Sequence, residues 1–190
     1  KPNGAPNICN TAIFKTKGWF EITNTALMYF SQFEYENTDG VTKAESPLIL
    51  QGGVFDQFTS TQRTAVSGMT IYIHVGSNVW IKNFGPGTHS DGSTSTPHVP
   101  VSVTGGDYEG FYLTGTYNAN AAARTDNAEC YISGGRFGEA AGASMEQIKG
   151  NVRWQIYDAD ITEFFGGGIN DDKPITGTIT TEIFNSHVEL

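Results

Sequence analysis

The chain has 190 residues, a length that fits one domain, and its net charge of −9 argues against nucleic acid as a partner, because phosphate binding requires a basic patch. Glycine (23 residues) and phenylalanine (12 residues) are frequent, and charged residues make up only 16%. This composition excludes a disordered chain and favours an all-β architecture with many tight turns. No apolar run approaches the length of a membrane span, so no membrane insertion is expected.

Short apolar triplets recur along the chain, and their starts lie 23 to 30 residues apart. Seven such triplets occupy residues 20–22, 48–50, 71–73, 101–103, 130–132, 154–156 and 181–183. Because side chains alternate along a strand, the first and third residues of each triplet are expected to point inwards and the middle residue outwards. A recurring unit too short to bury its own core indicates a stacked, repetitive fold.

A bend is predicted four and five residues after the start of each triplet. At the first of these two positions, six of the seven residues are Asn, Gly or Asp, and at the second every residue is small. The second position holds Gly53, Gly76, Gly106 and Gly135. Such residues tolerate a left-handed backbone, and a larger side chain there would collide with the next coil.

A second strand is predicted after the bend, with inward residues seven and ten places after the start of the triplet. The inward residues are Leu27, Phe55, Asn78, Tyr108, Phe137, Ile161 and Val188 at the first place, and Phe30, Phe58, Ile81, Phe111, Ala140 and Phe164 at the second. Asn78 interrupts the pattern, and Val79 is expected to restore it through a bulge. The agreement predicts an all-β solenoid of about seven coils, with a β-sandwich as the alternative.

The whole chain, residues 1–190, is interpreted as a single β-helix domain, with residues 1–18 as a leading partial coil or a cap. The last coil stops before its tenth position, which suggests either a fragment of a longer chain or a protein contact at the C-terminal end of the solenoid. Cys9 and Cys130 would lie about four coils apart unless the N-terminal segment folds back. The favoured interpretation of Cys130 is a small buried apolar side chain, although a disulfide is possible.

Three runs of sequence carry a resemblance to a known family. They are AECYISGGRFGE at 128–139, WQIYDADI at 154–161 and FGGGINDDKP at 165–174. Together they resemble predicted secreted or surface parallel β-helix proteins of gut Bacteroidetes, in the pectate-lyase-like superfamily, over roughly residues 97–190. The resemblance implies a right-handed parallel β-helix and export to the cell surface or medium, but it does not carry an activity, since one fold serves many functions.

The outward middle residues of the triplets were compared with the carboxylate pairs that cleave polysaccharides. Only Glu21 and Glu182, at the two ends of the row, are acidic, so no two carboxylates face a substrate across adjacent coils. Hydrolysing relatives carry Asn-x-Asp, Asp-Asp, His-Gly and Arg-x-Lys elements on successive coils, whereas Asn24-Thr25-Ala26 and His74-Val75-Gly76 here lack the Asp partners. No catalytic residue is predicted, and a non-enzymatic module is favoured. Polysaccharide lyase or glycoside hydrolase activity is one alternative, and a structural unit assembling end to end is another.

Four aspartates form the best candidate metal site. Asp158, Asp160, Asp171 and Asp172 offer oxygen ligands that suit Ca²⁺, the one cofactor considered. Turn chemistry favours a simpler interpretation, in which Asp158 fills the left-handed bend and the other pair forms a solvated turn. The four histidines lack metal-binding spacing and are expected in exposed loops.

Outward tyrosines indicate a ligand-binding surface. Tyr72 and Tyr131 both occupy the middle position of a triplet, two coils and roughly 10 Å apart, and Tyr157 lies close to them in the pattern. Flat aromatic faces suit sugar rings, so the three residues predict glycan binding by an extracellular or adhesin-type module. The alternative is that these rings only stack between coils and stabilise the fold.

Overall fold

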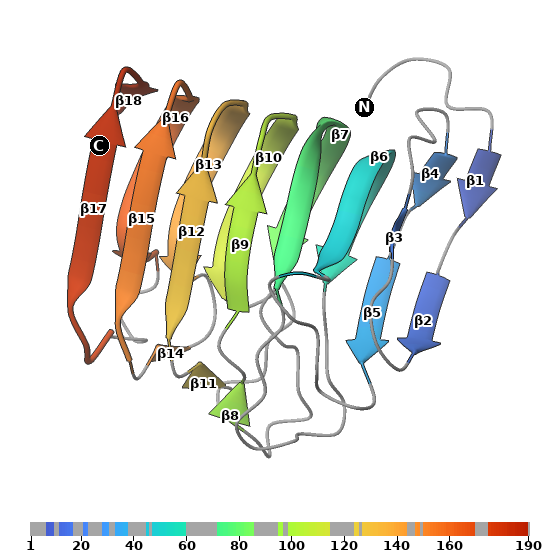
Figure 1. The fold of residues 1–190 in the computed structure, drawn as a ribbon, viewed down its shortest axis with the longest axis horizontal. Coiled ribbons are helices and arrows are strands. Elements are labelled where there is room, and N and C mark those ends of the chain that lie inside the picture. The colour runs from blue at the N-terminus through green and yellow to red at the C-terminus, as the bar shows by residue number, and fades with distance from the viewer. Residues whose placement is uncertain are drawn as a thin grey trace.

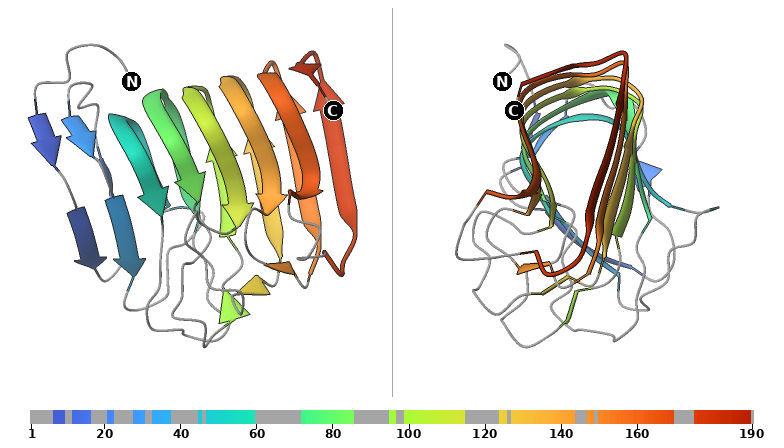
Figure 2. Two further views of the ribbon diagram at one scale, coloured as in Figure 1. Left: turned by 180° about the vertical axis from the view of Figure 1, so that it is seen from behind. Right: turned by 90° about the vertical axis from the view of Figure 1, so that its left-hand side faces the viewer.

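Parallel strands stack side by side along one axis in the computed structural model (Figure 1). The structure describes residues 7–9, 12–16, 21–22, 28–30, 33–37, 45, 47–59, 72–85, 95–96, 99–114, 124–125, 127–143, 147–148, 150–169 and 175–189. Every strand pairing among these residues is parallel. Seen along the axis, the strands wind around a common centre (Figure 2). The chain is therefore an all-β, parallel β-solenoid of about four turns.

The regular elements are all strands within the described part of the chain. They are β1 (Asn7–Cys9), β2 (Ala12–Thr16), β3 (Glu21–Ile22), β4 (Met28–Phe30), β5 (Phe33–Asn37), β6 (Leu48–Thr59), β7 (Ile73–Gly85), β8 (Ser95–Thr96), β9 (Val99–Val103), β10 (Asp107–Thr114), β11 (Arg124–Thr125), β12 (Ala128–Ile132), β13 (Arg136–Ala143), β14 (Gln147–Ile148), β15 (Val152–Tyr157), β16 (Asp160–Gly168), β17 (Ile179–Phe184) and β18 (His187–Val188). The described residues contain no helix long and apolar enough to span a membrane.

The predicted triplets form one face of the solenoid, made by β3, the first parts of β6 and β7, and then β9, β12, β15 and β17. Neighbouring strands align their inward residues in the order Leu48, Ile73, Val101, Cys130, Trp154 and Thr181. This register confirms the predicted triplets at 48–50, 101–103, 130–132, 154–156 and 181–183 and the described part of the first, Glu21-Ile22, and it corrects the third.

The third triplet is Ile73-His74-Val75 and not residues 71–73, because Leu48 pairs with Ile73. A shift of two residues returns every side chain to the same face of the strand. The apolar alternation therefore fits both registers equally well, and neighbouring strands decide between them. As a consequence, His74 and not Tyr72 occupies the outward middle position of this coil.

The bends follow the triplets as predicted, in a backbone conformation that favours glycine. Positive φ angles occur at Gly53, Gly105, Gly106, Gly134, Gly135, Asp158 and Asn185. Gly76 does not belong to this column, because Val79 pairs with Gly53 and contacts Gly106. The prediction for Gly76 was wrong because the triplet on β7 starts two residues later than expected and the register shifts by one further residue after Leu50.

The second strand of each coil also follows the predicted pattern, with two corrections. Phe55 pairs with Ile81, and Phe58 pairs with Phe84, so Asn78 is not an inward residue and is exposed. In the first coil Phe30 pairs with Phe55 and not with Phe58. The first correction has two causes: the triplet on β7 starts two residues later than expected, and the register in the β6–β7 pair shifts by one more residue between Leu50 and Gly52. Leu27 lies outside the described residues.

Stacked aromatic rings fill the core. Phe58, Phe84 and Phe111 form a stack with ring centroids 5.4 Å and 4.8 Å apart. The next residue in this column is Ala140, and Trp154 fills the space beside it from the opposite face, 6.4 Å from Phe111. Such alternation of large and small residues allows successive coils to reach close packing.

Cys130 is a free, buried thiol, as the favoured interpretation had it. Burial raises its pKa well above the ordinary value, because the charged thiolate is disfavoured away from water. The side chain of Cys9 lies outside the described part of the chain. At the other end of the solenoid, Ile179 and Ile183 of β17 are exposed. A protein contact at this end stays a prediction.

Candidate functional site

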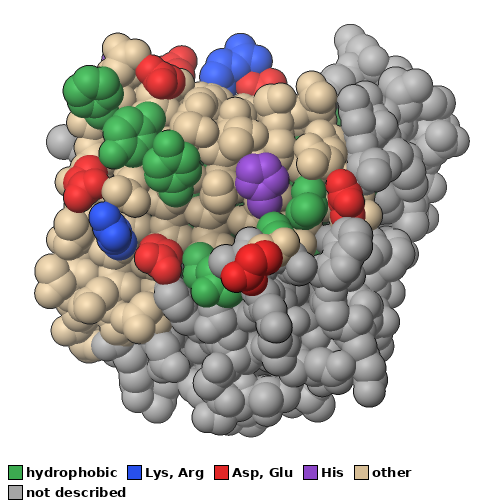
Figure 3. All heavy atoms as spheres, in the orientation of Figure 1, with side chains coloured by type: hydrophobic (Ala, Val, Ile, Leu, Met, Phe, Trp, Pro, Cys, Tyr) green, Lys and Arg blue, Asp and Glu red, His purple; other side chains and the backbone are tan. Residues whose placement is uncertain are grey.

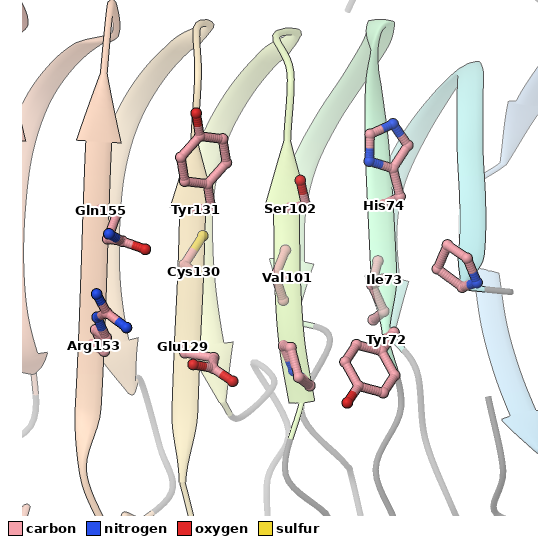
Figure 4. Close-up of a pocket in the computed structure, with 12 residues that line it drawn as sticks. Tyr72, Ile73, His74, Val101, Ser102, Glu129, Cys130, Tyr131, Arg153 and Gln155 are labelled. Carbon is pink, nitrogen blue, oxygen red and sulfur yellow. The ribbon is translucent and has the colours of Figure 1, made fainter. Parts of the chain in front are cut away.

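Two rows of side chains run across the strands on the outer surface of β7, β9, β12, β15 and β17 (Figure 4). One row is formed by the outward middle residues His74, Ser102, Tyr131, Gln155 and Glu182. The other lies two residues earlier on each strand and contains Tyr72, Pro100, Glu129 and Arg153. Because the strands are parallel and in register, each row runs along the axis of the solenoid.

A shallow hollow of about 360 Å³ lies between the two rows. Ile73, Val101 and Cys130, which point inwards between the rows, form its floor. Its walls come from five successive coils and combine aromatic, amide, hydroxyl and charged side chains (Figure 4). An apolar floor with polar groups around it is the usual composition of a small-molecule binding site.

Three aromatic rings extend diagonally from this hollow towards the C-terminal end. The ring of Tyr131 lies 5.5 Å from that of Tyr157, which in turn lies 6.2 Å from that of Phe184. Tyr131 is 44% exposed and Phe184 is 69% exposed. Figure 3 shows a group of hydrophobic side chains on this face of the molecule, over the strands near the C-terminal end. We call Tyr131, Tyr157 and Phe184 the aromatic track.

Charged and amide side chains border the aromatic track. The Gln155 side-chain amide donates a hydrogen bond of 2.8 Å to Glu182. Arg153 lies 3.8 Å from the other carboxylate oxygen of Glu182, and Glu129 is its direct neighbour on β12. These contacts fix the orientation of the polar groups beside the rings, which reduces the entropy that a ligand would have to remove.

The three predicted tyrosines all lie on this surface, although in different places. Tyr131 and Tyr157 contact each other, as their positions in the repeat suggested. Tyr72, one residue before β7, lines the hollow from the row that also contains Pro100, Glu129 and Arg153. Sequence reasoning missed His74, which was expected in a loop but lies on β7, and it missed Phe184. Phe184 stands three residues after the start of its triplet, as Tyr157 does, and this shared position was the available signal.

The two described aspartates of the proposed calcium site, Asp158 and Asp160, lie on another surface, near the bends. Asp158 has φ of 53° and accepts a hydrogen bond from the Asn185 amide, so it fills the left-handed bend as turn chemistry predicted. Asp160 contacts His187 at 2.9 Å. Asp171 and Asp172 lie outside the described residues. In the part of the chain that the structure describes, no three His, Cys, Asp or Glu side chains gather in a way that could hold a metal ion. Calcium binding stays a prediction.

His187 is expected to titrate above its ordinary pKa of 6.5. The hydrogen bond to Asp160 is the largest cause, followed by the charge of this carboxylate, and both favour the imidazolium form. The contribution of the His187–Asp160 pair to the stability of the folded chain is therefore fully present below pH 6.5, and it is lost as the pH rises through the raised pKa of His187. NMR titration of the His187 ring should show this pKa, and Asp160→Asn should lower it. Glu163→Gln, which removes another exposed carboxylate from β16, should leave it unchanged, and an equal effect of both changes would contradict the assignment.

The fold and this surface define a class of protein: a parallel β-solenoid whose outer face carries a row of aromatic rings beside a hollow with an apolar floor and polar groups around it. No protein-family model, curated protein or solved structure matches the chain. The argument for function therefore rests on the geometry and chemistry of the surface itself.

Proposed function

We propose that the chain is a non-enzymatic, extracellular or cell-surface module that binds a glycan along the aromatic track and the adjoining hollow. The proposal takes the solenoid as a right-handed β-helix of seven coils. Support for the handedness comes from the parallel strands, because crossover connections between parallel strands are right-handed in nearly all proteins. The proposed location rests on the resemblance of residues 97–190 to exported β-helix proteins.

The observation that carries this function is the spacing of the three rings. Tyr131, Tyr157 and Phe184 come from three successive coils, and their centroids are separated by 5.5 Å and 6.2 Å. The rings therefore repeat at close to the distance between coils, about 4.8 Å. A sugar chain laid across the strands would place its rings over successive side chains, which supports stacking at several points.

The polar surroundings suit a sugar as well. Hydroxyl groups of a glycan need donors and acceptors at the edges of the stacked rings, and Gln155, Ser102 and Glu129 supply both beside the apolar floor. Glu182 already accepts from Gln155 and pairs with Arg153. These two contacts orient the Glu182 carboxylate beside the rings.

Replacing the central ring of the track is the sharpest test of this proposal. Native gels cast with soluble polysaccharides should retard the wild-type protein, and Tyr157→Ala should weaken binding about tenfold, the equivalent of roughly 1.4 kcal/mol, because one stacking partner is removed. Phe165→Ala is the matched control, since Phe165 is an exposed ring on β16, away from the track. Equal effects of the two substitutions, or the absence of retardation by any polysaccharide, would refute the proposal.

A further inference from the structure

The charges beside the aromatic track point to a particular class of glycan. Glu129 lines the hollow, and Glu182 lies beside the track, where it accepts a hydrogen bond from Gln155. Among the described residues that line the hollow, Arg153 is the only Lys or Arg. Both carboxylates lie next to Arg153, one at 3.8 Å and the other on the neighbouring strand. The negative charges at this surface therefore outnumber the positive charge of the guanidinium.

We propose that the ligand is an uncharged polysaccharide and that acidic polysaccharides are rejected, an inference that rests on the proposed glycan-binding function. A uronate or sulfate group is normally recognised by an arginine that offers its paired N–H groups to the anion. Here the guanidinium already faces carboxylates of the protein. An incoming anionic group would have to compete with these carboxylates for Arg153 and would also lie close to two like charges. Both effects weaken the binding of acidic polysaccharides.

The arrangement of the rings also indicates how the bound glycan is oriented on the solenoid. The track runs from Tyr131 on β12, past Tyr157 on β15, to Phe184 on β17, so the glycan crosses the strands and follows the solenoid axis. Gln155 on β15 and Glu182 on β17 lie in the row beside the rings. The hydrogen bond between them leaves the second amide hydrogen of Gln155 and further lone pairs of the Glu182 carboxylate for sugar hydroxyls. Neutral hydroxyl groups can use these donors and acceptors without the cost of like-charge repulsion.

The experiment compares native gels that contain neutral polysaccharides (β-glucan, xyloglucan, mannan) with gels that contain acidic ones (polygalacturonate, alginate) at low salt, where charge effects are greatest. We expect a neutral polysaccharide to bind at least about tenfold more tightly than either acidic one. Glu182→Gln keeps the shape of the side chain and its contact with Gln155 but releases Arg153. This variant should therefore reduce the difference in affinity between neutral and acidic polysaccharides several-fold. Glu163→Gln, on β16, makes the same change in net charge and should leave the difference as it is.

The outcomes separate this inference from the function on which it rests. Tighter binding to a neutral polysaccharide, reduced in Glu182→Gln and not in Glu163→Gln, supports it. Acidic polysaccharide bound as tightly as neutral, with Tyr157→Ala still weakening binding, overturns the neutral class and leaves glycan binding standing. If none of the five polysaccharides retards the wild-type protein, both proposals fail. Circular dichroism of each variant confirms that it is folded before its binding is compared.

Discussion

Trp154→Ala is expected to lower the free energy of unfolding by roughly 3–5 kcal/mol, the usual cost of removing a buried aromatic side chain. Trp154 is fully buried, and its ring lies 5.2 Å from that of Phe164 and 6.4 Å from that of Phe111. The indole N–H also donates a hydrogen bond of 2.9 Å to the carbonyl of Gly166. Alanine would leave a cavity between two coils and remove the donor for that carbonyl.

Urea unfolding followed by far-ultraviolet circular dichroism measures this effect without relying on the tryptophan that is removed. The control is Arg153→Ala, the neighbouring residue on β15, whose side chain is exposed and pairs with Glu182 at the surface. An exposed ion pair contributes little, so this variant should lose less than about 1 kcal/mol. A cost below about 1 kcal/mol for Trp154→Ala would show that the core is not packed as described.

The Trp154 ring packs against Phe111 and Phe164, the residues on either side of Ala140 in its column, and this contact illustrates how far the repeat could be read from the sequence. The pattern correctly gave Trp154 and Ala140 inward positions, because alternation and spacing depend only on the local chain. It did not show that the large residue on one face fills the gap left by the small one on another, since that depends on which coils meet across the core. Periodicity predicts which side chains are buried, and packing decides which of them touch.

The candidate site shows the same division between local and non-local information. Tyr131 and Tyr157 were correctly expected near each other, because both positions follow directly from well-defined triplets. His74 was missed since a register shift of two residues on β7 preserves the apolar alternation, and only hydrogen bonding to the neighbouring strands distinguishes the two possibilities. Phe184 directly follows the last triplet, outside the apolar alternation that guided the sequence analysis, so the pattern gave no reason to single it out.

Gly106→Ala is expected to cost roughly 2–3 kcal/mol, because the bend after β9 requires a residue without a side chain. Gly106 has φ of 101°, a conformation that costs other residues on the order of 1–3 kcal/mol. A Cβ atom at this position would also lie 2.6 Å from Cγ2 and 3.2 Å from the carbonyl oxygen of Val79 in the preceding coil. The two coils would have to move apart, which strains the parallel pairing between β7 and β10.

The matched comparison is Asn185→Gly at the bend of the last coil. Asn185 has φ of 49°, so glycine relieves backbone strain there but removes a hydrogen bond to Asp158, and the net change should stay within about 1 kcal/mol. Urea unfolding of both variants measures the difference. If Gly106→Ala is as well tolerated as Asn185→Gly, the bends do not hold the coils in close contact. A large cost at Gly106 alone shows that the spacing between coils, which also sets the spacing of the aromatic track, depends on these glycines.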